Sequence, residues 1–426
     1  MSFDRDAIFT GSLADVDRQI LDKIDEHAAQ NAATVNLIAS ESYAPRATLE
    51  AEVSTLINCN ASGYPPRRSL GGSDIIDGIE EIAIQRARDL FGAEHANVQA
   101  LSSTIANIAV VRALVPRGGR ILSFAPLAGG HMSHGAAKHL SGQEFEIRHF
   151  GTVGEADDID YEGAATLARK FRPHLVVAGS SAYPRIIDFA RLRAVADDAG
   201  ALLFADIAHV AGLVVAGLHP DPVPVCDVVT TSTHKTLCGP RTGGLILCRS
   251  RFAPAIDAAL SPGLQAAGGA HIMAARAVLF RLAARAEFRA LMRAVVAHAR
   301  VLADALRDAG LRLYGGGTDT HMVVVDLRNS SWERDAVVRL LFEHGVLANA
   351  VTLPPMPGGL GQTGLRLGSN AMTIRCAGAD AFRSMAVCLG VLLRDPGGHR
   401  VHPDVRARIG SLAARYPVPR THVLPH

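Results

Sequence analysis

The sequence predicts an α/β protein built on a mainly parallel sheet. From about residue 47 to residue 290, short apolar β-branched segments alternate with alanine-rich segments, a pattern typical of strands joined by crossover helices. After residue 290 the pattern changes to a shorter unit that has its own strands and a helix. The expected strands of the sheet are Arg120–Phe124, Leu175–Ala178, Leu202–Ala205, Val225–Thr230 and Gly244–Cys248.

Three regions are expected in order along the chain. Residues 1–45 form an N-terminal arm, with a helix over Asp15–Gln30 and then an extended segment over Asn36–Tyr43. Residues 46–290 form the large domain. Residues 291–426 form a smaller C-terminal α+β domain, which alanine- and arginine-rich helices over Ala274–Arg307 precede. Within the smaller domain we expect a helix over Ser331–His344, a loop over Pro354–Gly361 and a strand over Gly364–Leu367.

Composition narrows the class of protein. Of the 426 residues 48% are hydrophobic, which is enough for a large core and two or three domains. The net charge of +2 gives no sign of a nucleic-acid or membrane partner. The six cysteines form no CxxC pair, so we expect neither a metal site nor a disulfide framework. This cysteine pattern favours a reduced, cytoplasmic compartment. The N-terminus lacks the apolar segment of a signal peptide.

Lys235 and Asp206 are the first candidates for a reactive site. Lys235 follows a threonine-rich β-segment in DVVTTSTHKTLCGP, where burial would depress its pKa and make the amine nucleophilic. An imine with an aldehyde cofactor would remove its charge. Asp206 ends the apolar segment ALLFAD, where a carboxylate needs a cationic partner such as a protonated pyridine nitrogen. The alternatives are an exposed lysine at a strand end and an aspartate that caps the next turn.

Three other segments contain residues that could bind a cofactor or a substrate. Ser103 and Thr104 open a helix, whose free N–H groups would bind a phosphate unless this is an ordinary cap. His131 follows two glycines in LAGGHMSHG, so a tight turn could lay its imidazole against a ring; a plain loop histidine is the alternative. Arg366 lies in the apolar segment GLRLGSNA and favours a carboxylate, from an amino-acid substrate or from within the protein.

These segments together resemble the serine hydroxymethyltransferase family of fold-type I enzymes, which use pyridoxal 5'-phosphate (PLP). The resemblance covers nearly the whole chain, and the segment around Lys235 is too long for a chance match. LAGGHMSHG is similar to the family's LAHGGHLTHG with one residue fewer. The other similar segments are NLIASES, SAYPRIIDF, ADIAHVAGLVVAGLHPDPVP, VVTTSTHKTLCGPR and GLRLGSNAMTIR.

The resemblance implies a role for each matching residue. Lys235 would hold PLP as a Schiff base, next to His234, and Asp206 would contact the pyridine nitrogen with His209 beside it. His131 would stack on the ring, and Ser181 would lie near the cofactor hydroxyl. Ser40 and Arg366 would bind the substrate carboxylate. The family's active site is shared across a homodimer, so a dimer or a dimer of dimers is expected.

The departures from the family pattern lie on the side where folate binds. The family has roughly NKYAEGYPGRRYYGG where this chain has NCNASGYPPRRSLGG at residues 58–72. Asn60 therefore replaces a tyrosine that meets the cofactor phosphate of the neighbouring subunit, and Ser62 replaces a glutamate that handles protons. Serine is not a proton carrier of that kind at ordinary pH. The remaining departures are Ser69 and Leu70 for two tyrosines, Ala266-Ala267-Gly268 for GGP, an inserted Thr242, and Val351 for an asparagine.

This asymmetry predicts that the family's chemistry at the Cα atom of the amino-acid substrate is kept, while the molecule that accepts or donates the side-chain carbon differs. We expect a PLP enzyme that makes or breaks the Cα–Cβ bond of a β-hydroxy-α-amino acid through a glycine quinonoid, as an L-threonine aldolase or transaldolase does, with amino acids and aldehydes as substrates. The departures argue against tetrahydrofolate. The alternatives are an ordinary folate-dependent hydroxymethyltransferase, another PLP reaction at Cα (racemisation, decarboxylation or transamination), and a non-catalytic PLP-binding scaffold. Three groups could take over the proton transfer that the missing glutamate performs in the family: Tyr64, His134 and a bound water.

Overall fold

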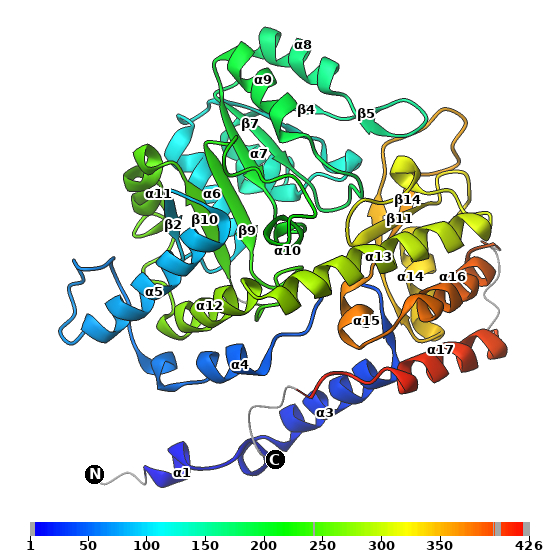
Figure 1. The fold of residues 1–426 in the computed structure, drawn as a ribbon, viewed down its shortest axis with the longest axis horizontal. Coiled ribbons are helices and arrows are strands. Elements are labelled where there is room, and N and C mark those ends of the chain that lie inside the picture. The colour runs from blue at the N-terminus through cyan, green and yellow to red at the C-terminus, as the bar shows by residue number, and fades with distance from the viewer. Residues whose placement is uncertain (1–4, 242, 395, 397–401, 421–426) are drawn as a thin grey trace.

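A seven-stranded sheet forms the centre of the larger unit (Figure 1). The computed structural model describes residues 5–241, 243–394, 396 and 402–420, so Thr242 lies outside the described residues. The strand order is β2-β10-β9-β8-β7-β3-β4, with β4, β3, β7, β8 and β9 parallel and β10 antiparallel to both of its neighbours. The strands are β2 (His95–Asn97), β3 (Arg120–Phe124), β4 (Glu146–Phe150), β7 (Leu175–Gly179), β8 (Leu202–Asp206), β9 (Val228–Ser232) and β10 (Gly244–Cys248). The predicted α/β class with a mainly parallel sheet is confirmed.

Both faces of this sheet are covered, which explains why its strands are apolar throughout. Alternate residues of β7 enter different cores: Leu175 and Val177 pack with helices α6 (Ser103–Leu114) and α11 (Ala253–Leu260). Val176 and Ala178 pack on the opposite side with α5 (Asp74–Phe91), α9 (Phe189–Ala199) and α12 (Ala270–Ala283). A sheet buried on both faces loses the polar–apolar alternation of a one-sided sheet.

The C-terminal unit has a separate core and a smaller sheet. Its strands run in the order β11-β14-β13 and are antiparallel: β11 (Met322–Asp326), β14 (Thr363–Gly368) and β13 (Asn349–Thr352). Helices α14 (Arg334–Glu343) and α16 (Ala379–Leu393) pack on this sheet, and the long α13 (Ala286–Asp308) runs from the larger unit to it (Figure 1). The boundaries at residues 45 and 290 stay predictions.

The end of the N-terminal arm is built into the C-terminal unit. Helix α3 (Arg18–Ala33) leads into β1 (Val35–Asn36), which pairs in parallel with β12 (Val346–Leu347). Val35 and Leu37 are fully buried in the C-terminal core. The N–H of Gly368, the last residue of β14, donates to the carbonyl of Leu37, so the residues that follow β1 are held close to β14. No helix of the described residues is long and apolar enough to cross a membrane.

Three predicted elements differ from the observed ones. Strand β9 begins at Val228 instead of Val225, because the N–H groups of Val225 and Cys226 close a turn on the carbonyl of Pro222. The predicted helix Asp15–Gln30 is interrupted at Asp17, whose side chain caps a new helix, α3, by accepting from Ile20 N–H. The predicted helix Ser331–His344 is shorter in the structure, where α14 spans Arg334–Glu343. The helices predicted over Ala274–Arg307 are observed as α12 and α13.

Candidate active site

Four neighbouring strands each carry one of the predicted site residues just beyond or at their carboxyl ends. His131 follows β3, Ser181 follows β7, Asp206 ends β8 and Lys235 follows β9. The four strands are parallel and adjacent, in the order β9-β8-β7-β3. Their carboxyl ends therefore meet at one edge of the sheet, where open α/β sheets bind ligands.

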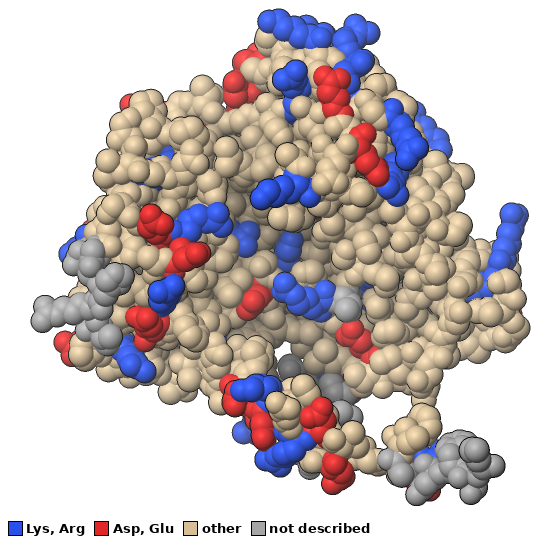
Figure 2. Space-filling model, turned by 180° about the vertical axis from the view of Figure 1, so that it is seen from behind, with Lys and Arg blue, Asp and Glu red and all other residues tan. Residues whose placement is uncertain are grey.

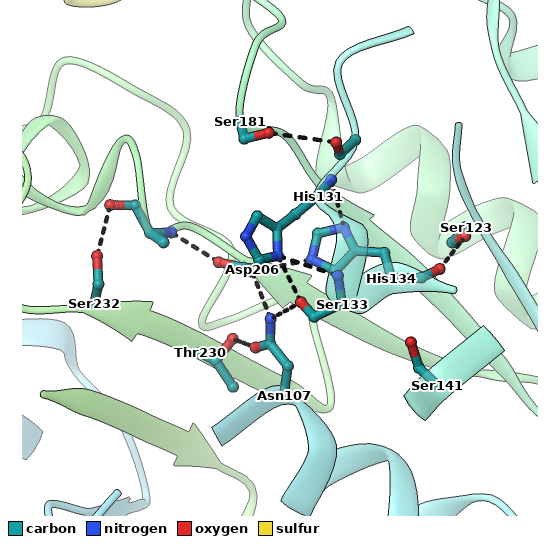
Figure 3. A network of polar contacts seen from close by, with 12 residues as sticks. Asn107, Ser123, His131, Ser133, His134, Ser141, Ser181, Asp206, Thr230 and Ser232 are labelled. Carbon is teal, nitrogen blue, oxygen red and sulfur yellow. Dashed lines mark hydrogen bonds and ion pairs between the residues drawn. The ribbon is translucent and has the colours of Figure 1, made fainter. Parts of the chain in front are cut away.

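Asp206 is the centre of a polar network at this edge (Figure 3). Its side chain is buried, at 7% relative exposure, and one carboxylate oxygen accepts from Asn107 Nδ2 at 2.7 Å and from His134 Nε2 at 2.9 Å. The other oxygen accepts from the N–H of Ala208 at 2.9 Å. Thr230 Oγ1 in turn donates to Asn107 Oδ1 at 2.6 Å. Burial alone would raise the pKa of Asp206, but the hydrogen bond and charge of His134 hold it well below its ordinary value.

His131 lies beside this network with a defined tautomer. The N–H of Ser133 donates to His131 Nδ1 at 3.2 Å, so the proton of the neutral ring is on Nε2. Burial lowers the pKa of His131 to about 4, so the ring is neutral at pH 7. His134 is bonded at both nitrogens, because its Nδ1 also accepts from the N–H of His131 at 3.4 Å.

The turn that carries Lys235 is fixed by its neighbours. Thr236 Oγ1 donates to the carbonyl of His209 at 2.8 Å, and Gly239 N–H donates to the carbonyl of Thr233 at 2.7 Å. Burial lowers the pKa of the Lys235 amine from 10.5 to about 8, and the Asp206 carboxylate only partly opposes this effect. Roughly a tenth of the amine is therefore uncharged and nucleophilic at pH 7, against less than about a thousandth for an ordinary lysine.

The rate at which PLP loads onto the cofactor-free protein is expected to rise with pH and to level off above about pH 8. Only the uncharged amine attacks an aldehyde, and its fraction grows until the pH passes the pKa of about 8, whereas an ordinary lysine would continue to gain up to 10.5. Stopped-flow absorbance over a pH series measures this rate, with the exposed-lysine variant Lys138→Ala as the unchanged control. A rate that still climbs steeply at pH 10 would contradict the depressed pKa.

Ser103 and Thr104 are the first two residues of α6, which starts at the same edge of the sheet. The hydroxyl of Ser102 caps the helix by accepting from Ile105 N–H at 3.1 Å. The helix does not use the N–H groups of its first turn, which leaves those of Ser103 and Thr104 available for an anion. Gly244 approaches this helix start so closely that a Cβ there would lie 2.4 Å from the carbonyl oxygen of Ser102.

Arg366 on β14 reaches the site from the C-terminal unit. Its Nε donates to Asn349 Oδ1 at 3.1 Å and one terminal nitrogen donates to the carbonyl of Ser181, so the side chain bridges the two units. The arm brings Ser40 to the same place: Gly368 N–H donates to Leu37 O at 2.7 Å, and a Cβ at Gly368 would meet Ala39.

A cavity with a volume of about 560 Å³ lies between the arm and the turn that contains His234, although Lys235 itself does not line it. Ser40 lines it together with His234 and Arg241. Seen from behind, the surface is hollowed near its middle, and basic side chains are visible at the hollow (Figure 2). Ser40 and His234 thus share one cavity.

Residues 13–389 match the sequence profile of the family described as serine hydroxymethyltransferase. The chain belongs to the serine hydroxymethyltransferase family. This confirms the predicted fold-type I class and makes the chain a member of a family of PLP-dependent transferases. The nitrogen and oxygen atoms of His131, His134 and Asp206 lie within 4.8 Å of one another, a spacing that also suits a metal ion, but membership of this family favours the organic cofactor.

The residues present fit PLP. A nucleophilic lysine, a buried carboxylate and a helix start match the aldehyde, the pyridine nitrogen and the phosphate of this molecule. Two buried polar atoms in the residues just before Lys235, Thr233 Oγ1 and His234 Nδ1, have no hydrogen-bond partner among the residues that the structure describes. Unpaired buried groups of this kind are costly unless a ligand satisfies them. The role of each residue stays a prediction.

Sequence reasoning missed several residues of the site. Asn107 gave a usable signal, since it is a polar residue four positions after Ser103 in a helix that is otherwise apolar, on the same face. Ser133, Thr230, Asn349 and Arg241 gave no signal of this kind. Thr230, for example, contacts Asn107 across 123 residues.

Proposed function

We propose that this member of the family is a folate-independent enzyme that breaks and makes the Cα–Cβ bond of β-hydroxy-α-amino acids. L-Threonine would be a donor, and a second aldehyde would be the acceptor. The observation that carries this proposal is that the cofactor side of the site keeps the family's residues, whereas the folate side has lost its acid. Residues 58–72 contain no aspartate or glutamate.

The altered positions lie against each other. Ser62 pairs with Ala267 in an antiparallel bridge, so the serine that replaces the glutamate contacts the loop in which Ala266 and Ala267 replace glycines. The hydroxyl of Ser62 donates to Asn60 Oδ1 at 2.9 Å, which joins a third replaced position to the same cluster. Changes that cluster in space support one altered subsite rather than independent drift.

Each residue of the site has a role in this reaction. PLP, when bound, supplies an electron-withdrawing ring that takes up the electron pair left at Cα. Lys235 would hold it, and Asp206 would keep a proton on its ring nitrogen. Arg366 and Ser40 would bind the substrate carboxylate, and His131 would cover one face of the ring and exclude water from it.

The proton of the β-hydroxyl must leave as the side chain departs as an aldehyde. His134 is not free to accept it, because both of its nitrogens are hydrogen-bonded. Tyr64 is also engaged: its hydroxyl donates to the carbonyl of Asp257 at 2.9 Å and accepts from Asn97 Nδ2 at 3.0 Å, and burial raises its pKa. We therefore assign this proton to a bound water.

The proposed enzyme is a homodimer, or a dimer of dimers, that shares its sites between subunits. Large apolar side chains that are exposed in the single chain flank residues 58–72 on both sides, namely Val53, Ile57, Ile75 and Ile82. A patch of this kind favours burial against another protein surface. A single chain at working concentration in sedimentation analysis would contradict this assignment.

An assay of two reactions on purified, PLP-loaded protein tests the function. We expect L-threonine with an aromatic aldehyde to give acetaldehyde and a new β-hydroxy amino acid without folate, and L-serine with tetrahydrofolate to give little glycine. Fast, folate-dependent serine cleavage would overturn the proposal, because it would show that another group replaces the missing glutamate. Absence of both reactions would also overturn it and would favour another reaction at Cα.

A further inference from the structure

His209 meets another histidine, His321, which directly precedes β11 of the C-terminal unit. Both residues are buried, with exposures of 4% and 0%. His209 Nδ1 lies 3.4 Å from His321 Nε2, and the two ring planes are only 17° apart with centroids separated by 5.5 Å. The nitrogen–nitrogen distance of 3.4 Å is within reach of a hydrogen bond between the rings, in which one nitrogen donates and the other accepts.

The main chain of the arm decides which nitrogen donates. The carbonyl oxygen of Ala39 lies 3.2 Å from the same His321 Nε2. A carbonyl oxygen only accepts, so Nε2 must carry the proton, and His209 Nδ1 must be an acceptor. The opposite arrangement would turn the lone pair of Nε2 toward the lone pairs of the carbonyl oxygen.

The other nitrogen of His321 supports the same assignment. Nδ1 is buried and has no hydrogen-bond partner in the described part of the chain. If the proton were on Nδ1, a buried N–H would lack an acceptor, at a cost of about 1–3 kcal/mol. A doubly protonated ring is also disfavoured, since burial and the nearby Arg366 guanidinium lower the pKa of His321 to about 3.

We propose that His321 is a positioning residue that fixes His209 as the tautomer with its proton on Nε2. His209 then has an N–H left to donate, close enough to Lys235, Arg366 and His131 for their charges to act on it, while the arm holds His321 through Ala39, next to Ser40. The use of this N–H toward the cofactor rests on the proposed function. The tautomer itself does not, because it follows from the protein's own contacts.

The tautomer is measured on the full-length, PLP-free protein labelled with ¹⁵N-histidine. Long-range proton–nitrogen NMR correlations distinguish the two tautomers, and the His209→Asn variant identifies the signals of His209. We expect wild-type His209 to show an unprotonated Nδ1 and a protonated Nε2. The opposite pattern in the wild-type protein overturns the proposal, whether or not any variant folds and whether or not the enzyme cleaves threonine.

Two variants of His321 separate donation from packing. His321→Phe removes the donor, so the His209 signals should shift to the other tautomer or to a mixture, and PLP affinity should fall by roughly two- to tenfold, the effect of one neutral hydrogen bond. His321→Gln can still donate from its amide and should retain the wild-type pattern. The control is His298→Phe, which changes a histidine stacked on Phe382 in the C-terminal unit and should alter neither value. Equal effects of the Phe and Gln variants, or none in either, would overturn the proposal.

Discussion

Replacement of Lys235 with alanine is expected to abolish covalent attachment of PLP and to lower turnover by about 10³-fold or more. Lys235 is placed to be both the amine that holds the cofactor and a group that moves protons beside it, and a positioned acid–base group alone contributes about 10²–10⁴-fold. The site should keep some affinity for free PLP, because Asp206 and the start of α6 remain.

The sequence makes the attachment point simple to establish. There are only four lysines: Lys23, Lys138, Lys170 and Lys235. Borohydride reduction of the PLP-loaded protein followed by peptide mass spectrometry should find the added mass on the Lys235 peptide alone, and Lys138→Ala should leave this result and turnover unchanged. Label on another lysine, or full activity of Lys235→Ala, would remove Lys235 from the reaction.

Lys235 and Asp206 could be predicted from the sequence because Asp206 ends an apolar β-segment and Lys235 follows a threonine-rich one, and a charge at the end of a buried strand has few explanations. The residues at which β3 and β10 begin were also predictable, since local glycines mark them. Gly118 and Gly119 precede β3, and Gly243 precedes β10. The start of β9 was not, because Val225 and Cys226 are apolar but belong to a turn that a proline begins.

Contacts between distant parts of the chain explain the rest of what was missed. His134 contacts Asp206 across 72 residues, and His321 contacts Ala39 across 282. The pattern around His321 shows only a polar residue before an apolar strand, which describes many histidines equally well. Its role depends on the arm that crosses the end of β14, and no local pattern in the sequence shows where this arm lies.

Replacement of Asp206 with asparagine is expected to lower turnover by about 10²–10³-fold, the loss that is typical when one preorganised electrostatic group is removed from an active site. The substitution changes little in volume, but it alters the hydrogen bonds. One oxygen of Asp206 accepts from both Asn107 Nδ2 and His134 Nε2, and the other accepts from Ala208 N–H. An asparagine amide has one oxygen, so its NH₂ group must face a donor whichever way it is turned.

The buried Asp227 offers a matched control at the opposite end of the sheet. Its carboxylate accepts from the N–H of Leu203 and from the Arg193 guanidinium, at the start of β9 and therefore at the opposite end of this strand from Lys235. Asp227→Asn should therefore lower the melting temperature without changing turnover per folded molecule, whereas Asp206→Asn should lower turnover far more than its stability loss explains. Steady-state kinetics and thermal melts on both variants give the comparison. Equal ratios of turnover to folded fraction in the two variants would mean that Asp206 supports only the fold, and the polar network around it would then be structural rather than the holder of a cofactor's ring nitrogen.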